Sequence, residues 1–120
     1  MGQAAALAPA DQRAFAATLK ERLQLEQARL HAAFEADGNG RRLIAGRARL
    51  VDEALREVWQ QLNVPAGIAL AAVGGYGRGE LYPGSDVDIL ILAPDDFCNA
   101  AEHRRCVEQL IGLLWDIGLE

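Results

Sequence analysis

Apolar residues recur every three to four positions through the first part of the chain, which is the spacing of one face of an α-helix. The positions that form this stripe are Phe15, Leu19, Leu23, Leu30 and Phe34. Asp11 precedes the stripe and is expected to cap the helix at its start. The segment 37–40, Asp-Gly-Asn-Gly, is expected to end it, because glycine readily adopts the left-handed conformation of a helix C-terminus.

Two further segments have helical spacing. A second helix is expected from about Arg41 to Leu62, with Gly46 weakening it locally and Pro65 following its end. A last helix is expected to start at residue 99 or 100. Its apolar side is formed by Val107, Leu110, Ile111, Leu114 and Trp115.

Between these helices the pattern changes to short continuous apolar runs. Residues Ile68 to Val73 are expected to form a strand buried on both faces. A glycine-dense turn over 74–79 follows, and a short polar connection then leads to a second strand from Asp86 to Leu92. Helices together with a short pair of strands predict an α+β fold.

Composition limits the classes of function. The 120 residues carry a formal net charge of −5, so the chain has no overall basic field for binding nucleic acid. No apolar run approaches the roughly 20 residues that cross a bilayer. The N-terminus lacks the basic residues that open a secretory signal. We therefore expect a cytoplasmic protein with neither a membrane nor a nucleic-acid partner.

The segment Asp86-Val87-Asp88 carries the first candidate chemistry. Residues two apart on a strand point to the same face, so both carboxylates project together while Val87 points into the core. Paired carboxylates repel each other unless a cation lies between them, and Mg²⁺ prefers such oxygen ligands. An isolated Asp-x-Asp is more often an exposed strand edge, so this pattern alone leaves both interpretations open.

The glycines before this strand strengthen the metal interpretation. Gly74-Gly75 ends the first strand, and a tight glycine turn lets backbone N–H groups approach an anion without obstruction by side chains. The run has neither the Gly-x-Gly-x-x-Gly spacing of a dinucleotide loop nor the Gly-Lys-Ser/Thr ending of a P-loop. What remains is a phosphate-holding turn followed by two metal-binding acids on the next strand.

This combination resembles a known signature. Val73-Gly74-Gly75 followed by Asp86-Val87-Asp88 resembles the DNA polymerase β-type nucleotidyltransferase superfamily. The longer string over 72–90, AVGGYGRGELYPGSDVDIL, closely resembles the family of bacterial PII uridylyltransferase/uridylyl-removing enzymes, as does LLWDIGLE over 113–120. The stronger resemblance covers about residues 67–120, and its implied fold is the start of a small mixed sheet flanked by helices.

The resemblance implies roles for individual residues. Gly74 and Gly75 would hold the phosphates of UTP, and Asp86 and Asp88 would be the catalytic ligands of Mg²⁺. The implied reaction transfers UMP from UTP to a tyrosine of the nitrogen regulatory protein PII and releases pyrophosphate. Two metal ions would clamp the attacking and leaving oxygens of an in-line displacement.

Two neighbouring residues have alternative roles. Ser85 is a candidate phosphate contact, or it is only a turn residue before the strand. Arg78 would either neutralise triphosphate charge or pair with Glu80 or Asp86 and stabilise the turn.

The sequence also departs from a complete enzyme. Superfamily members need a third carboxylate on a later strand, and no acid after Leu92 lies in a β-alternating run. The His-Asp phosphohydrolase domain that removes UMP needs clustered histidines, whereas the chain has only His31 and His103. The regulatory domains that bind glutamine are missing too. We therefore expect an N-terminal fragment, inactive alone, with a helical region over 1–66 and a truncated nucleotidyltransferase domain over 67–120.

Two other functions stay open at this point. One is a small stand-alone nucleotidyltransferase that modifies another protein or RNA, which the extended motif from Tyr76 to Asp88 disfavours. The other is a non-catalytic module that binds nucleotide or a partner without turnover. The intact Asp86 and Asp88 disfavour it, but the missing third carboxylate makes this the expected behaviour of the isolated chain.

The remaining features are expected to be structural. Two thiols, Cys98 and Cys106, are too few for a disulfide framework or a four-ligand zinc site. Trp59 and Trp115 lie on helical stripes and are expected to pack in the core. A basic cluster at the start of the second helix is expected to be a solvated face, with a contact to nucleotide or PII as the alternative. Its members are Arg41, Arg42, Arg47 and Arg49.

Overall fold

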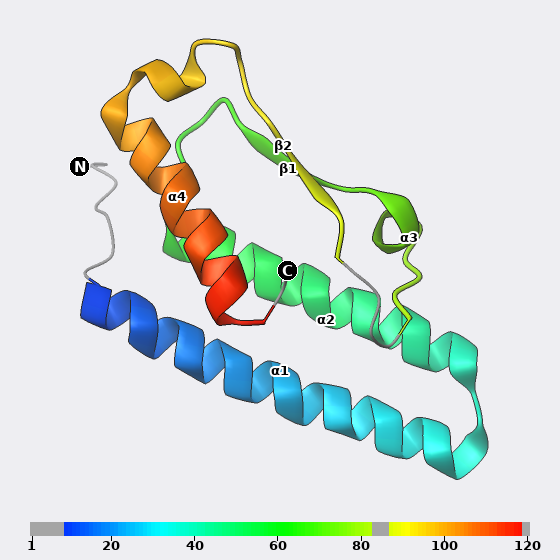
Figure 1. Cartoon of the computed structure of the whole chain (residues 1–120). Helices are drawn as coiled ribbons and strands as arrows, with labels where there is room; N and C mark the ends of the chain where they lie inside the picture. Colours follow the sequence, from blue (N-terminus) through cyan, green and yellow to red (C-terminus); the bar gives the residue numbers. More distant parts are fainter. Residues whose placement is uncertain (1–8, 83–86, 119–120) are drawn as a thin grey trace.

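The computed structural model describes residues 9–82 and 87–118. Two long helices, α1 (Pro9–Asp37) and α2 (Gly40–Gln61), run side by side in opposite directions and form a hairpin (Figure 1). The other elements are β1 (Ala69–Ala72), α3 (Gly74–Gly77), β2 (Ile89–Leu92), the one-turn 3₁₀ helix η1 (Phe97–Asn99) and α4 (Ala101–Asp116). They lie on one side of this hairpin, with α4 nearer the end where α1 begins and α3 farther toward the hairpin turn (Figure 1). The predicted α+β class is confirmed.

The helical hairpin follows the sequence pattern closely, with one correction at its start. Helix α1 begins at Pro9, so Asp11 lies within the first turn and is not the predicted N-cap. A carboxylate in the first turn still interacts favourably with the helix dipole. The second helix, α2, does have a side-chain N-cap: the side-chain oxygen of Asn39 accepts a hydrogen bond from the backbone N–H of Arg42 at 3.0 Å.

Gly46 has a packing role in the hairpin. A Cβ atom added at this position would lie 2.7 Å from Cδ2 of Leu30 on α1. The missing side chain therefore lets α1 approach α2 closely, and this packing benefit offsets the low helix propensity of glycine.

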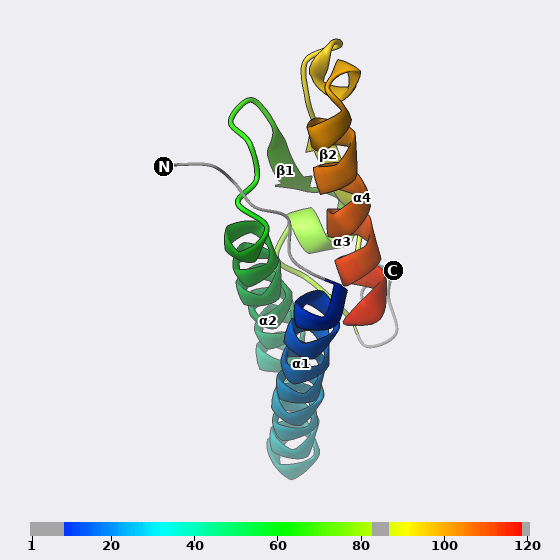
Figure 2. The ribbon, with the colours of Figure 1, turned by 90° about the vertical axis from the view of Figure 1, so that its left-hand side faces the viewer.

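The core lies where α4 crosses the hairpin. Helix α4 contacts both α1 and α2, and Figure 2 shows α4 running alongside the small sheet and down to the hairpin. The most deeply buried side chains come mainly from these helices: Leu19, Val51, Ala54, Val58, Leu110 and Leu113. Helix packing therefore supplies most of the buried apolar surface of the described chain.

The two strands pair antiparallel, with Ala72 opposite Ile89 and Ala69 opposite Leu92. The prediction of a strand buried on both faces is wrong: β1 is shorter than expected, and its residues are half-buried or exposed. Within the described residues each strand has only one neighbour, so β1 lies at a sheet edge with too little around it for two-sided burial. The assigned part of the second strand starts at Ile89, after Val87 and Asp88.

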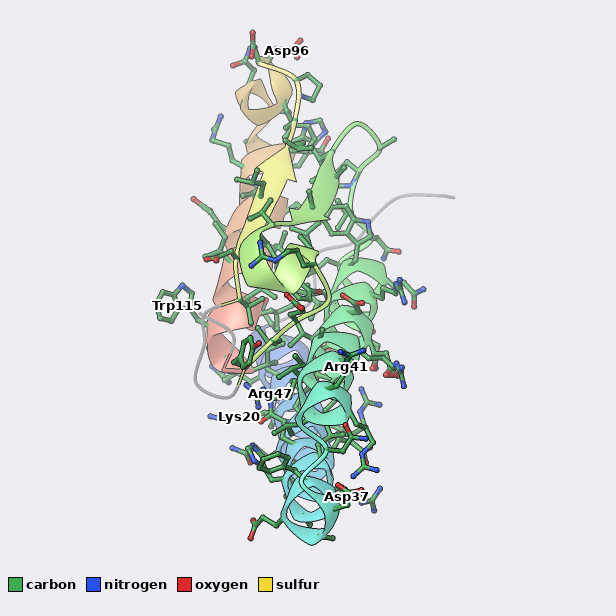
Figure 3. All side chains as sticks on the ribbon, turned by 90° about the vertical axis from the view of Figure 1, so that its right-hand side faces the viewer. Lys20, Asp37, Arg41, Arg47, Asp96 and Trp115 are labelled. Atoms are coloured by element: carbon green, nitrogen blue, oxygen red, sulfur yellow. The ribbon has the colours of Figure 1, made fainter. Side chains whose placement is uncertain are left out.

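Two aromatic residues of the predicted apolar stripes are not in the core. The Trp115 residue is 62% exposed and projects away from α4, so its predicted core role is wrong (Figure 3). The buried side of α4 is instead formed by Cys106, Leu110, Leu113 and Leu114. Trp115 lines an apolar hollow of about 320 Å³ between α4 and β2. Phe34 is exposed because it lies near the hairpin's far end, beyond the part that α4 covers.

Trp59 meets its prediction, since it is half-buried and packs against the core. Cys106 is buried, as expected of a small thiol, and burial raises its pKa. The side chain of Cys98 lies outside the described part of the structure.

Among the described residues, no helix combines the length and the apolar character that would allow it to span a membrane.

Candidate functional site

The pairing of the two strands brings the predicted site residues together. Gly74 opens α3 directly after β1, and Asp88 lies directly before β2. The antiparallel pairing continues beyond Ala72 and Ile89, because the Val73 N–H donates to the Asp88 carbonyl oxygen at 3.0 Å. The backbone of one strand end therefore holds the backbone of the other, and residues 74 and 88 become neighbours.

Gly74 and the Asp88 carboxylate are so close that a side chain at position 74 would make an unusually tight contact with it. Gly74 has a φ of +63°, a conformation that residues with a side chain rarely adopt. A Cβ atom built there would lie 3.0 Å from Oδ2 of Asp88. The backbone conformation therefore favours glycine at position 74, and any side chain there would also push the Asp88 carboxylate aside by a few tenths of an ångström.

Gly75 is also closely surrounded, but by backbone. A Cβ atom at this position would lie 3.1 Å from the carbonyl oxygen of Glu80. The Glu80 N–H in turn donates to the Gly75 carbonyl oxygen at 3.0 Å. The segment after α3 thus folds back onto Gly75 and closes the turn.

Arg78 lies at the C-terminal cap of α3, and its guanidinium is near Gly75. Its Nε atom is 3.4 Å from Oε1 of Glu80, and both side chains are largely exposed. This is one of the two roles that the sequence left open. An exposed pair at this distance contributes little to stability, so the guanidinium is free to turn toward an anion.

Of the two carboxylates predicted to bind the metal, the structure describes Asp88. Asp88 is exposed, and its side chain makes no hydrogen bond or ion pair within the described residues. A free carboxylate beside a glycine turn has the donor chemistry that Mg²⁺ prefers. Ser85 and Asp86 lie outside the described residues, so the predicted pairing of the Asp86 and Asp88 side chains stays a prediction. Val87 packs partly against the core, as the strand alternation predicted.

A search for three or more clustered metal-ligating side chains finds none among residues 9–82 and 87–118. Of the two predicted metal ligands, Asp88 is the one that the described part of the chain includes.

The sequence analysis missed a contact that ties α3 to α2. The Tyr76 hydroxyl donates a hydrogen bond to Oδ1 of Asp52, and Tyr76 is only 5% exposed. Burial and the neighbouring Asp52 carboxylate raise the pKa of Tyr76 well above its ordinary value. A buried tyrosine usually has a hydrogen-bond partner for its hydroxyl. Nothing in the sequence indicated which residue on α2 that partner would be.

The predicted basic cluster divides into exposed and half-buried members. Arg41, Arg42 and Arg49 are exposed, as expected of a solvated face, and Arg42 forms an ion pair with Asp37 at 2.7 Å. Arg47 is half-buried, and its Nε atom is buried without a hydrogen-bond partner in the described structure. Burial lowers the pKa of the Arg47 guanidinium.

Comparison with known proteins identifies the family. Residues 52–120 match the family described as "Nucleotidyltransferase domain". The chain therefore belongs to the nucleotidyltransferase domain family, and the predicted superfamily is confirmed. The match includes every residue predicted for the site, and it begins at Asp52, the partner of Tyr76.

Curated relatives point to one group of enzymes within this family. The chain is 50% identical over 102 residues to a "Bifunctional uridylyltransferase/uridylyl-removing enzyme" of Bordetella parapertussis, an alignment covering 85% of the chain and 12% of that protein. It is 44% identical over 114 residues to the protein of the same name in Aromatoleum aromaticum, and this alignment covers 93% of the chain and 13% of that protein. It is 46% identical over 101 residues to the protein of the same name in Burkholderia mallei, and this alignment covers 84% of the chain and 12% of that protein. These names confirm the predicted resemblance.

The chain thus spans about 12% of the length of the curated relatives that it matches. No solved structure matches it.

Proposed function

We propose that this chain forms the nucleotide-binding segment of a PII uridylyltransferase, an enzyme that transfers UMP from UTP to a tyrosine of PII. One observation carries the proposal: Gly74, in a conformation suited to glycine, lies directly against the free carboxylate of Asp88. A nucleotidyltransferase needs an open backbone for phosphate beside a carboxylate for metal, and this arrangement offers both. The names of the relatives support uridylyl transfer as the chemistry.

Each residue has a distinct task in this proposal. The backbone at Gly74 and Gly75 holds the phosphates of UTP, where the missing side chains leave room for close approach. Asp88, together with Asp86, holds Mg²⁺. Arg78, in its weak pair with Glu80, exchanges that partner for phosphate oxygen.

The chemistry is an in-line displacement at the α-phosphorus of UTP. A tyrosine oxygen of PII forms a bond to this phosphorus while the bond to the bridging oxygen of the β-phosphate breaks. The tyrosine gives up its hydroxyl proton to solvent water, and pyrophosphate leaves with the bonding electron pair. Bound Mg²⁺ supplies positive charge that stabilises the attacking and leaving oxygens. The chain's contribution is to position the phosphates and to hold the metal in place.

A transfer assay tests this proposal. The full-length protein that carries this chain is incubated with PII and with UTP labelled at the α-phosphate, with or without Mg²⁺. We expect the label to reach a tyrosine of PII and pyrophosphate to appear in equal amount, only when Mg²⁺ is present. CTP and ATP at equal concentration serve as controls for the base.

Three results would contradict the proposal, each in a different way. Label that reaches RNA or another protein but not PII would favour the alternative of a different target. Equal transfer from ATP would overturn the assignment of UTP. Binding of UTP without release of pyrophosphate in the presence of PII would indicate a non-catalytic module.

A further inference from the structure

Two contacts fix α3 to the side of α2. Three of the four residues of α3 are glycine, so Tyr76 carries its only side chain, and this side chain donates a hydrogen bond to Asp52. The second contact lies just beyond the turn, where the Leu81 N–H donates to the carbonyl oxygen of Ile44 at 3.2 Å. The Leu81 side chain is buried as well. Helix α2 thus holds both the turn and the segment that leaves it.

A turn of this composition has little intrinsic order. Its backbone hydrogen bonds in the described structure are all local to the turn, among them Gly77 N–H to the Val73 carbonyl oxygen at 2.9 Å and Gly79 N–H to that of Tyr76 at 2.9 Å. A single helical turn is unstable alone, and glycine loses more backbone entropy on ordering than any other residue. The turn therefore needs contacts from outside to keep one conformation.

Tyr76 and Asp52 border a cavity between α2 and β1. The cavity has a volume of about 480 Å³, and Trp59 is also among its lining residues. Close packing does not fill the space on this side of the turn. The ring of Tyr76 is buried in the core, and its directional contact with Asp52 adds a hydrogen bond between α3 and α2 on the side where close packing is incomplete.

We propose that Asp52 and Tyr76 act as a positioning pair, which holds Gly74 and Gly75 in the arrangement that binds the triphosphate. This inference rests on the proposed function. Tyr76 lies one residue from Gly75 and two from Gly74, which contacts Asp88. A change in the position of the tyrosine therefore moves the backbone that approaches the phosphates. When only part of the population has the competent turn, the apparent Kd rises in inverse proportion to that fraction.

Calorimetric titration of the full-length protein with Mg²⁺ and α,β-methylene-UTP, which cannot release pyrophosphate, tests the pair. We expect Tyr76→Phe, which keeps the ring and removes the hydroxyl, to raise the Kd by about tenfold. Asp52→Ala should have the same effect. Asp52→Asn keeps an acceptor oxygen and should restore most of the affinity, a rescue that loss of packing cannot explain.

Leu23→Ala is the control for stability, because Leu23 is buried on α1 and has no part in the site. At a temperature well below its Tm, this variant should bind the analogue with unchanged Kd. If Tyr76→Phe lowers the Tm but also leaves the Kd unchanged, the pair has only a structural role and the inference is overturned. If the unaltered protein binds no analogue, the proposed function fails, and this inference fails with it.

Hydrogen exchange tests the positioning directly, without nucleotide. In Tyr76→Phe we expect the amides of Gly77 and Gly79 to exchange faster, while the amides of α4 keep their rates. Unchanged exchange at both glycines would overturn the inference even if the unaltered protein binds UTP.

Discussion

The helical hairpin and the region from β1 to β2 are stabilised in different ways. In the hairpin and α4, apolar side chains are buried against one another, and Val58 and Leu113 have no exposed surface. In β2, Leu90 and Leu92 are 51% and 54% exposed. The inward side chains of this region, among them Leu70, Ile89 and Tyr76, pack against the helical core, and backbone hydrogen bonds such as that from Val73 to Asp88 join the two strands. The helices therefore supply the stability, while the more open region displays the candidate chemistry.

This division has a consequence for function. A site of backbone and free carboxylates must stay accessible to a charged ligand, so it cannot lie in a close-packed core. It needs a stable neighbour to hold it, and α2 has that role because it contributes both to the core and to the contact with Tyr76. Changes in the two regions should therefore affect different measurements.

The largest expected effect is on chemistry, at Asp88. We expect Asp88→Asn in the full-length protein to reduce the rate of UMP transfer by about a thousandfold or more, because a metal stabilises transition-state charge by several kcal/mol. Its unfolding transition should change little, since the side chain is exposed. The matched control is Asp95→Asn, an exposed aspartate after β2, which should transfer UMP normally. Undiminished transfer by Asp88→Asn would refute its assignment as a metal ligand.

The next effect separates the two regions by stability. We expect Leu113→Ala to lower the free energy of unfolding by about 2–5 kcal/mol, because it leaves a cavity in the core. Leu92→Ala removes the same atoms from an exposed strand position and should change the free energy of unfolding by less than about 0.5 kcal/mol. Urea denaturation followed by circular dichroism measures both. Equal losses in the two variants would show that the sheet is as well packed as the helices.

A smaller effect distinguishes glycine needed for backbone conformation from glycine needed for close approach. Gly74 and Gly38 have similar positive φ values, +63° and +69°, but a Cβ atom at Gly38 would meet nothing within 4 Å. Both Gly→Ala variants should lose about 1–2 kcal/mol of stability from backbone strain. Only Gly74→Ala should also bind UTP more weakly, by about tenfold, because the new methyl group displaces Asp88. The same UTP affinity in both variants would remove position 74 from the site.

The smallest effect lies on the surface of the hairpin. Arg22 on α1 forms an exposed ion pair with Glu57 on α2. We expect Arg22→Gln to cost at most about 1 kcal/mol, and 1 M salt to abolish the difference. Arg29→Gln breaks a pair within α1, Arg29 with Glu26, and should cost about 0.2–0.5 kcal/mol. A larger loss at Arg22 that persists in high salt would show that this pair contributes more than an exposed pair can.

The sequence predicted the helices better than the strands for a physical reason. A long amphipathic helix repeats its signal over many turns, so α2 was located to within one residue at each end and the start of α1 to within about three. A four-residue strand such as β1 has no repeat, and its burial depends on neighbours that the local sequence does not specify. Trp115 shows a related limit, because a wide apolar face on α4 does not indicate which part of it meets the core.

The candidate site was predicted in part. The sequence indicated Gly74, Gly75 and Asp88, because the glycine turn and the strand acid follow each other at a characteristic spacing. The contact between Tyr76 and Asp52 joins residues 24 positions apart and depends on how α3 lies against α2. Such a pairing arises from tertiary packing, and no local pattern reports it.

The central claim is that Gly74, Gly75 and Asp88 form a nucleotide site, and titration of the ¹⁵N-labelled chain with UTP in the presence of Mg²⁺ tests it most directly. Backbone amide signals of these three residues should shift in a saturable way. Signals from the far end of the hairpin, around Gly38, should stay in place. Saturable shifts confined to the hairpin, or none at residues 74, 75 and 88, would contradict the claim.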